Sequence, residues 1–248
     1  MVTRNSIIDY INDYLGSALI KDASQNGLQV EGRENIRKIV FGVSANLEFF
    51  KKAAAAKADM VITHHGLLWS QNPAVTGIFK KRIEFLIKHD INLASWHLPL
   101  DMHAVLGNNA QMVKKLGVKN IKSFGVYHGV KIGFMGLLPK EMTLKEVESK
   151  FAVKPNLVFN FGKSKNKIVA IISGGGYDMF EQAVDAGADL FITGSSEEFV
   201  QEIAREGKIN YMALGHYNSE VYGVKALMGL VGKKFKVSTE FIDVANPI

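Results

Sequence analysis

The chain has 248 residues, a net charge of +6 and no cysteine, and 47% of its residues are hydrophobic. This length allows one large domain or two of ordinary size, and the apolar content is sufficient for a packed core. The absence of cysteine excludes disulfides, thiolate metal sites and cysteine nucleophiles. The basic residues are scattered, which favours a solvated lysine surface or a small anionic substrate; nucleic acid is disfavoured but stays open.

No targeting or membrane segment is predicted. The first residues lead into an amphipathic stretch and not into the apolar core of a signal peptide. No segment approaches the roughly 18 uninterrupted apolar residues of a membrane helix. We therefore expect a cytoplasmic protein without a membrane partner.

The first half of the chain is predicted to begin with a helix, because Ile7, Ile8, Ile11 and Leu15 fall on one helical face. An apolar strand over residues 39–44, a helix over 47–56 and a second strand over 60–63 follow. This order is typical of a β-α-β unit, in which two parallel strands flank a helix.

The second of these strands ends in the most informative pair of residues, His64-His65, followed by Gly66. The two imidazoles are therefore expected at the carboxyl end of a buried strand, where open α/β sheets place their ligand sites. Adjacent residues on a strand point to opposite faces. On this ground we expect His64 and His65 to serve two different metal ions.

A third strand, over residues 93–96, leads to His97 and, four residues later, to Asp101. A helix over residues 109–116 and a strand over 118–124 are predicted to follow. The histidine and the carboxylate would thus also lie at the carboxyl end of a strand, beside the first histidine pair.

The second half repeats this order. Residues 183–195 (AVDAGADLFITGS) match residues 53–65 (AAAAKADMVITHH), and strands over 168–173 and 211–214 take the places of their first-half counterparts. His216 and Glu220 repeat the spacing of His97 and Asp101. Such ordered matches predict an internal duplication.

The remaining predicted elements of the second half are grouped around this repeat. They are a helix over 177–186, a helix over 222–231, a closing strand over 235–241, and an extra strand pair, 130–137 and 156–161, around a helix opened by Thr143. We expect two α/β halves, residues 1–124 and 125–248, with the boundary near Phe124-Gly125. An interleaving of the C-terminal segment with the first half is left open.

Histidines and carboxylates that follow these strands form the candidate site. Imidazole and carboxylate ligands suit zinc, iron, manganese or nickel. The five residues exceed what one catalytic zinc takes, and fit two ions that share a bridging carboxylate and a water. The expected ligands are His64, His65, Asp101, His216 and Glu220.

Such a centre would acidify its water and supply a hydroxide nucleophile near neutral pH. His97 is the candidate proton shuttle, because it lies four residues from Asp101 and need not itself bind metal. His89, His103 and His128 lack such a context and are expected to be structural or exposed.

The second half departs from the first at the position of the histidine pair, where it has Gly194-Ser195. One site between the halves is therefore predicted, and not one site in each. The loop from Gly194 to Glu198 could open a helix and take an anion at its free N–H groups, although an ordinary serine cap is the favoured alternative. The three glycines from Gly174 are interpreted as a plain turn, because they match no phosphate-binding pattern.

At these residues the chain resembles the Nif-three-like family of dinuclear metal proteins, the GTP cyclohydrolase I type 2 homologues, over nearly its whole length. The order of several short elements carries the resemblance. They are Asn26-Gly27-Leu28-Gln29-Val30, Ala58-Asp59 through His64-His65-Gly66, His97-Leu98-Pro99-Leu100-Asp101, Gly107-Asn108-Asn109, and Gly215-His216 through Glu220.

The resemblance implies metal binding by the five expected ligands, with Glu220 as the bridge. It also implies a homohexameric ring with the metal sites facing an inner cavity, and attack on the guanine ring of GTP. Many members have His-Thr-Asn-x-Asp at the third element, whereas this chain has Leu98-Pro99, so contacts around the ligands differ.

Two hypotheses follow for the function. The first is a dinuclear metal-dependent hydrolase of a small anionic, nucleotide-like substrate, GTP cyclohydrolase-type by resemblance. The second is a non-catalytic metal-binding assembly or adaptor protein that recruits protein or nucleic-acid partners.

Overall fold

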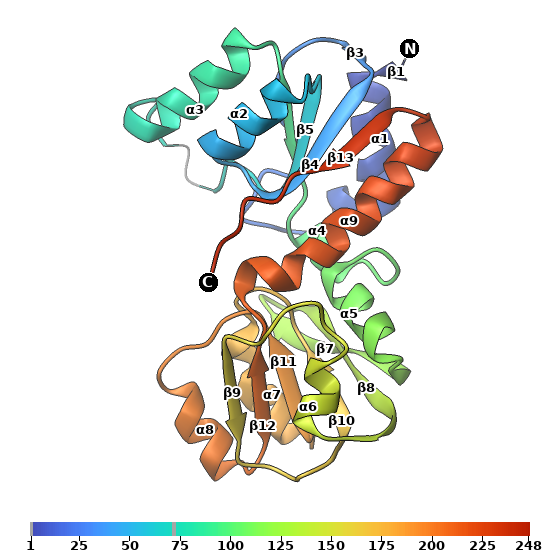
Figure 1. Ribbon diagram of the computed structural model, residues 1–248, viewed down its shortest axis with the longest axis vertical. Coiled ribbons are helices and arrows are strands. Elements are labelled where there is room, and N and C mark those ends of the chain that lie inside the picture. The colour runs from blue at the N-terminus through green and yellow to red at the C-terminus, as the bar shows by residue number, and fades with distance from the viewer. Residues whose placement is uncertain (1, 71–72) are drawn as a thin grey trace. The chain divides into compact units, whose positions relative to one another are not determined.

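The structure is a computed structural model that describes residues 2–70 and 73–248, and it shows a mixed α/β fold, as the sequence predicts. The chain forms two compact units (Figure 1). The first unit runs to His103 and includes Val224–Ala245, and the second contains Ala104–Gly223 and Asn246–Ile248. Each unit is described by itself.

The unit boundary lies earlier than residues 124 and 125, where the sequence indicates it. Those two residues fall inside strand β7 (Lys119–Tyr127), which pairs along its length with β8 (Val130–Met142). A boundary there would cut a hydrogen-bonded ladder. The segment Val224–Ala245 belongs with the first unit, which is the interleaving that the sequence leaves open.

The first unit is built on a five-stranded sheet in the order β13-β4-β5-β6-β2. Strands β13, β4, β5 and β6 are parallel, and β2 pairs antiparallel with β6 at the edge. Its elements are β1 (Val2–Thr3), α1 (Arg4–Leu15), the 3-10 turn η1 (Ser17–Leu19), β2 (Gly27–Val30), β3 (Asn35–Ile36), β4 (Lys38–Ser44), α2 (Leu47–Ala55), β5 (Met60–His65), α3 (Gly77–Lys88), β6 (Asn92–Ser95), α4 (Leu98–Met102), the later part of α9 (His216–Phe235) and β13 (Ser238–Phe241).

Strand alternation decides what each face of this sheet buries. Val40, Val61 and Leu93 point to one face and pack in a core with Phe49 of α2 and Leu86 of α3. In Figure 1, α2 and α3 accordingly lie on the same side of the sheet. Each fully buried side chain of this size stabilises the fold by about 1.5–3 kcal/mol. Because these strands are parallel, their carboxyl ends lie at one edge of the sheet, and the packed core holds that edge rigid.

The second unit is built on a six-stranded sheet in the order β7-β8-β10-β11-β12-β9. Strands β10, β11 and β12 are parallel, with antiparallel β8 and β9 beside them. Besides β7 and β8, its elements are α5 (Asn108–Leu116), α6 (Leu144–Glu148), β9 (Leu157–Asn160), β10 (Asn166–Ile171), the 3-10 turn η2 (Gly176–Met179), α7 (Phe180–Asp185), β11 (Leu190–Thr193), α8 (Val200–Glu206), β12 (Asn210–Ala213) and the start of α9.

Two details of the second unit differ from the sequence prediction. The extra strands β8 and β9 do not pair with each other: β8 pairs with β10, and β9 pairs with β12 at the opposite edge. Helix α9 begins at His216 and not near Tyr222, directly after Gly215, whose φ is +94°. The Thr143 capping box of α6 is present as predicted.

In both units a buried aspartate accepts hydrogen bonds from two consecutive backbone N–H groups of a neighbouring segment. In the first, Asp59 Oδ2 accepts from the backbone N–H groups of Arg37 (2.7 Å) and Lys38 (3.0 Å). In the second, Asp189 Oδ2 accepts from those of Lys167 (2.9 Å) and Ile168 (2.9 Å).

A buried asparagine is likewise used twice. Asn92 accepts through Oδ1 from Gly32 N at 2.8 Å, and its Nδ2 donates to Arg33 O. Asn210 accepts through Oδ1 from Gly162 N at 2.8 Å, and its Nδ2 donates to Lys163 O. Each amide satisfies backbone groups that the sheet itself leaves open.

Among the described residues, 2–70 and 73–248, no helix combines the length and apolarity that crossing a membrane would require.

Candidate metal centre

The histidine pair lies at the end of β5, where the sequence predicts it. His64 is fully buried, and its Nδ1 is 2.9 Å from the carbonyl oxygen of Trp96. The ring centroids of His64 and His65 are only 4.7 Å apart. The rings thus lie close together at the end of the strand, and the assignment of each histidine to a different metal ion stays a prediction.

His97 joins this pair from the loop after β6. One ligand atom from each of His64, His65 and His97 lies within 4.8 Å of the others, a separation that a metal ion could bridge. Asp101, on the short helix α4, places its Oδ2 at 3.4 Å from His64 Nε2. The first unit thus gathers three imidazoles and one carboxylate at the edge where its parallel strands end.

The sequence interpretation misses Asp22, which holds His97 in place. The carboxylate lies in the loop between η1 and β2, and its Oδ1 is 3.0 Å from His97 Nδ1. Burial by itself raises the pKa of Asp22, but hydrogen bonds and charge from His97, with further bonds from Asn26 and Ser24, bring it down to about 2. A lone aspartate in a polar loop carries no sequence signal of this role.

The element Asn26-Gly27-Leu28-Gln29-Val30 supports the loops around the histidines. Asn26 Oδ1 accepts from His97 N at 2.8 Å. Gln29 Oε1 accepts from Leu67 N (2.7 Å) and Leu68 N (3.1 Å), directly after the histidine pair. These amides fix the two loops that carry the imidazoles.

The second unit contributes a histidine and a carboxylate from the first turns of α9. His216 Nε2 lies 3.2 Å from Glu220 Oε1, at the i,i+4 spacing that puts both on one helix face. The carboxylate is almost fully buried.

Gly174 makes room for this pair. A Cβ at Gly174 would lie 2.4 Å from Glu220 Oε1 and 3.1 Å from His216 Nε2, and its φ is +62°. Any side chain would collide with both groups and strain the backbone. The glycine turn after β10 thus allows the backbone to approach the ligands, a use that the sequence does not indicate.

The donor set fits divalent transition metals. Each histidine has its Nδ1 beside a protein oxygen, which leaves Nε2 as the nitrogen for a ligand role. The partners are Trp96 O for His64, Ser44 Oγ at 3.3 Å for His65, Asp22 for His97, and Ser195 Oγ at 3.4 Å for His216. Neutral imidazoles with two carboxylates are ligands of zinc, iron, manganese and nickel.

The start of the Gly194–Glu198 loop is closed by its own backbone hydrogen bonds. The N–H groups of Gly194 and Ser195 both donate to the carbonyl of Gly174 at 3.0 Å. Helix α8 begins only at Val200. The predicted serine cap is therefore wrong, and the N–H groups of Gly194 and Ser195 are not available to an anion.

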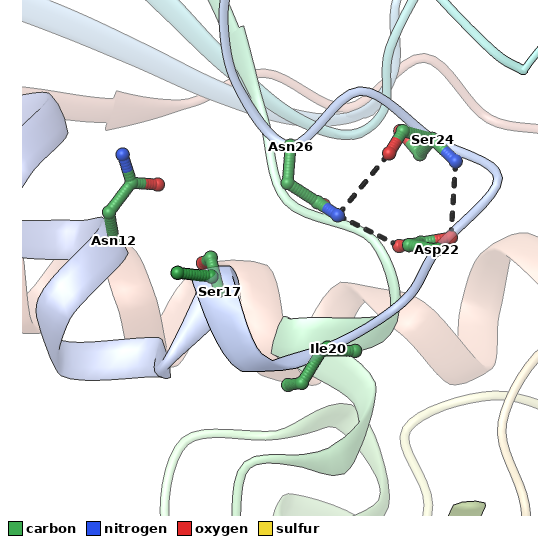
Figure 2. Close-up of a pocket in the computed structure, with 7 residues that line it drawn as sticks. Asn12, Ser17, Ile20, Asp22, Ser24 and Asn26 are labelled. Carbon is green, nitrogen blue, oxygen red and sulfur yellow. Dashed lines mark hydrogen bonds between the residues drawn. The ribbon is translucent and has the colours of Figure 1, made fainter.

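Two cavities lie beside these residues, one in each unit. The first, of about 320 Å³, is lined by Asn12, Ser17, Ala18, Ile20, Asp22, Ser24 and Asn26 (Figure 2). The second, of about 420 Å³, is lined by Leu157, Phe159, Ser196, Glu197, Glu198 and Gln201. Neither lining contains a lysine or an arginine, so neither cavity by itself attracts a phosphate.

The other three histidines have different surroundings. His89 ends α3 and stacks on Phe85, His103 stacks on Tyr14, and His128 lies in the β7–β8 turn with a φ of 46°. Burial lowers the pKa of His103, against a hydrogen bond to the backbone of Tyr14 that raises it. None of the three belongs to the ligand groups of the described residues.

The fold and the site define a mixed α/β protein with histidine and carboxylate groups that could bind a metal ion. The chain belongs to the Duf34/NIF3 (NGG1p interacting factor 3) family, whose model matches residues 2–247. This confirms the family resemblance of the sequence.

Similar proteins cover the whole chain. A relative from Archaeoglobus fulgidus is 42% identical over 96% of both chains, and one from Pyrococcus abyssi is 40% identical over 97% of both; each is named GTP cyclohydrolase 1 type 2 homolog. The solved structure of TTHA1606 from Thermus thermophilus is similar with a TM-score of 0.91 and 32% identity over 100% of both chains. A structure titled protein ybgI, of unknown function, has a TM-score of 0.93 and 35% identity over 100% of both.

Proposed function

We propose that this protein is a dinuclear metal-dependent hydrolase of a small anionic, nucleotide-like substrate. His64, His65 and Asp101 of the first unit, together with His216 and Glu220 of the second, would hold the two ions, with Glu220 as the bridge. The names of the relatives support a GTP cyclohydrolase-type reaction as the specific form of this proposal.

The observation that carries the proposal is the convergence of imidazoles in the first unit. Three histidine ligand atoms lie within 4.8 Å of one another, with a carboxylate 3.4 Å from His64. Imidazole and carboxylate groups brought this close together are the ligands that divalent transition metals take.

Chain connectivity supports the joining of the two ligand groups into one site. Asp101 lies just before the chain passes from the first unit to the second, and Glu220 lies just before it returns at Val224. The matched use of Asp59 and Asp189 supports the accompanying proposal that the units arose by duplication.

The residues have separate roles in this proposal. Bound divalent ions would supply Lewis acidity and activate water. His97 would transfer a proton through Nε2, because its Nδ1 is engaged by Asp22. Since the two cavities lack basic side chains, recognition of an anionic substrate would depend on the charge of the metal ions.

The test is metal analysis of the purified protein followed by a substrate screen. We expect two equivalents of metal, and turnover of GTP or of phosphate esters that zinc, manganese, iron or nickel restores after chelation. His97→Ala should keep the metal and lower turnover by about 10²–10⁴-fold, the usual range for a general acid–base. Full activity of His97→Ala would remove its role as the shuttle.

The second candidate function is a non-catalytic metal-binding assembly or adaptor protein. The family description, which names an interacting factor, favours it. A cytoplasmic homohexamer would suit either candidate. Metal bound tightly, with no turnover on any substrate of the screen, would favour the adaptor.

A further inference from the structure

Asp22 makes an unusually complete set of contacts for a loop carboxylate. Its side chain is 2% exposed. Oδ1 accepts from His97 Nδ1 at 3.0 Å and from Ser24 N at 3.1 Å, and Oδ2 accepts from Leu98 N at 2.9 Å and from Asn26 Nδ2 at 3.0 Å. Figure 2 shows Asp22 with its bonds to Ser24 and Asn26. Both oxygens are therefore fully used.

Three of these four donors cannot change their role. Ser24 N and Leu98 N are backbone amides, and the Asn26 amide is fixed in orientation because its Oδ1 accepts from His97 N at 2.8 Å. The fourth, His97 Nδ1, is the one group that can be either donor or acceptor. A carboxylate in this position makes it the donor.

We propose that Asp22 is a positioning residue that fixes both the ring orientation and the tautomer of His97. The proton is held on Nδ1 by Asp22, and Nε2 keeps its lone pair. The inference rests on the proposed role of His97 as the proton shuttle, and it names the residue that prepares the shuttle.

A comparison with the other site histidines supports a specific role for this contact. The Nδ1 of His64 lies beside a backbone carbonyl, and those of His65 and His216 lie beside serine hydroxyls at 3.3 and 3.4 Å. The Nδ1 of His97 instead contacts a carboxylate, at a shorter distance than the two serine contacts. A carboxylate makes the opposite ring nitrogen more basic, as a proton acceptor requires.

The substitution Asp22→Asn separates the two possible tautomers. The new amide oxygen is expected on the side of Leu98 N and Asn26 Nδ2, because these are two fixed donors against one, Ser24 N, on the other side. The NH₂ group then faces His97 Nδ1 and forces the imidazole proton to Nε2. Little volume changes, so the fold has no cavity to accommodate.

The experiment is nitrogen NMR of the histidine side chains in the zinc-loaded protein, with His97 assigned from its absence in His97→Gln. We expect the Nδ1–H tautomer in the unsubstituted protein and the Nε2–H tautomer in Asp22→Asn, with metal content unchanged and turnover lower by roughly 10–100-fold. Asp189→Asn, which changes a buried carboxylate bonded to Lys163 and backbone, is the matched control and should leave His97 in the Nδ1–H form.

The proposal is overturned if His97 carries its proton on Nε2 in the unsubstituted protein, a measurement that does not require Asp22→Asn to fold. It is also overturned if Asp22→Asn leaves the tautomer unchanged. Because the tautomer is read without turnover, these failures are distinct from failure of the hydrolase proposal, which would appear as absent activity in a protein with the expected tautomers.

Discussion

The two units hold their parallel strands in the same way but place different chemistry at the strand ends. Asp59 and Asp189 each accept from two consecutive backbone N–H groups and from one basic side chain, Arg33 at 3.0 Å or Lys163 at 2.7 Å. At the end of the central strand, however, the first unit has His64-His65 and the second has Gly194-Ser195.

This difference shows that the residues that hold the parallel strands together are not the residues that determine the chemistry at the strand ends. The strand ends in the first unit supply imidazoles, and the corresponding loops of the second are closed by their own backbone bonds to Gly174. The second unit brings its ligands from a helix instead. Four predictions test this division of roles, from the largest expected effect to the smallest.

The largest effect is expected from His64→Ala, which removes a buried ligand from the first unit. Metal affinity should fall by more than the roughly 10–100-fold that loss of an outer partner causes. Calorimetric titration of the metal-free protein with zinc measures it. The control is His89→Ala, at the end of α3, which should bind zinc as the unsubstituted protein does. Unchanged zinc affinity in His64→Ala would contradict the proposal that metal binds at this strand end.

Gly174→Ala tests whether His216 and Glu220 of the second unit need the space that Gly174 leaves by having no side chain. We expect metal affinity to fall by about 10–100-fold, because the new methyl group displaces Glu220 and His216, which it would otherwise contact at 2.4 and 3.1 Å.

The matched control for this variant is Gly187→Ala, whose φ of +71° carries the same backbone strain, about 1–2 kcal/mol, with no atom within 4 Å of the new Cβ. Zinc titration and thermal unfolding of both variants separate strain from collision. Equal metal affinities in the two variants would show that Gly174 is needed only for its backbone conformation and not to avoid a collision.

The matched aspartates predict a shared effect on stability. Asp59→Ala and Asp189→Ala should each lower the free energy of unfolding by about 2–3 kcal/mol, since each leaves backbone N–H groups without their charged acceptor. Urea unfolding measures this quantity, with the exposed Asp9→Ala as control. A loss of stability with only one of the two substitutions would show that the two aspartates do not have equivalent roles.

The smallest expected effect is in the acid stability of the second unit. Burial raises the pKa of Asp189, but bonds from Lys163, Ile168 and Lys167 outweigh it and hold the pKa below its ordinary value. A folded pKa below the unfolded one means that the ionised carboxylate stabilises the fold above the ordinary aspartate range, about 3.9.

This contribution is lost as the pH falls through the lower, folded pKa. Urea unfolding at a series of acidic pH values should therefore show a weaker decline for Asp189→Asn than for the unsubstituted protein. The same slope in both would mean that Asp189 does not contribute to acid sensitivity.

Local patterns were sufficient to predict much of the fold. The β5 strand before His64, the Thr143 capping box and the β-α-β order that recurs in both units follow from apolar runs and turn residues, which act over a few neighbouring positions. The Ala-Asp step before β5 and β11 was recognisable as a repeat, and it carries Asp59 and Asp189.

Those local patterns did not predict which strands pair with each other when they are far apart in the chain. Strands β8 and β9 join opposite sides of the second sheet, and the C-terminal segment returns to the first unit, because strand partners are selected by packing over the whole unit. The contacts of Asp22 with His97 and of Gly174 with Glu220 also join residues far apart in the chain.

The sequence by itself thus determined the class of fold, the family and which residue types could bind metal, since hydrophobic periodicity and residue chemistry are local properties. Only the tertiary structure decided how the rings of His64 and His65 converge, which carboxylate holds His97, and why Gly174 must lack a side chain. Those features depend on distances between segments that are separated along the chain, and such distances are set by packing.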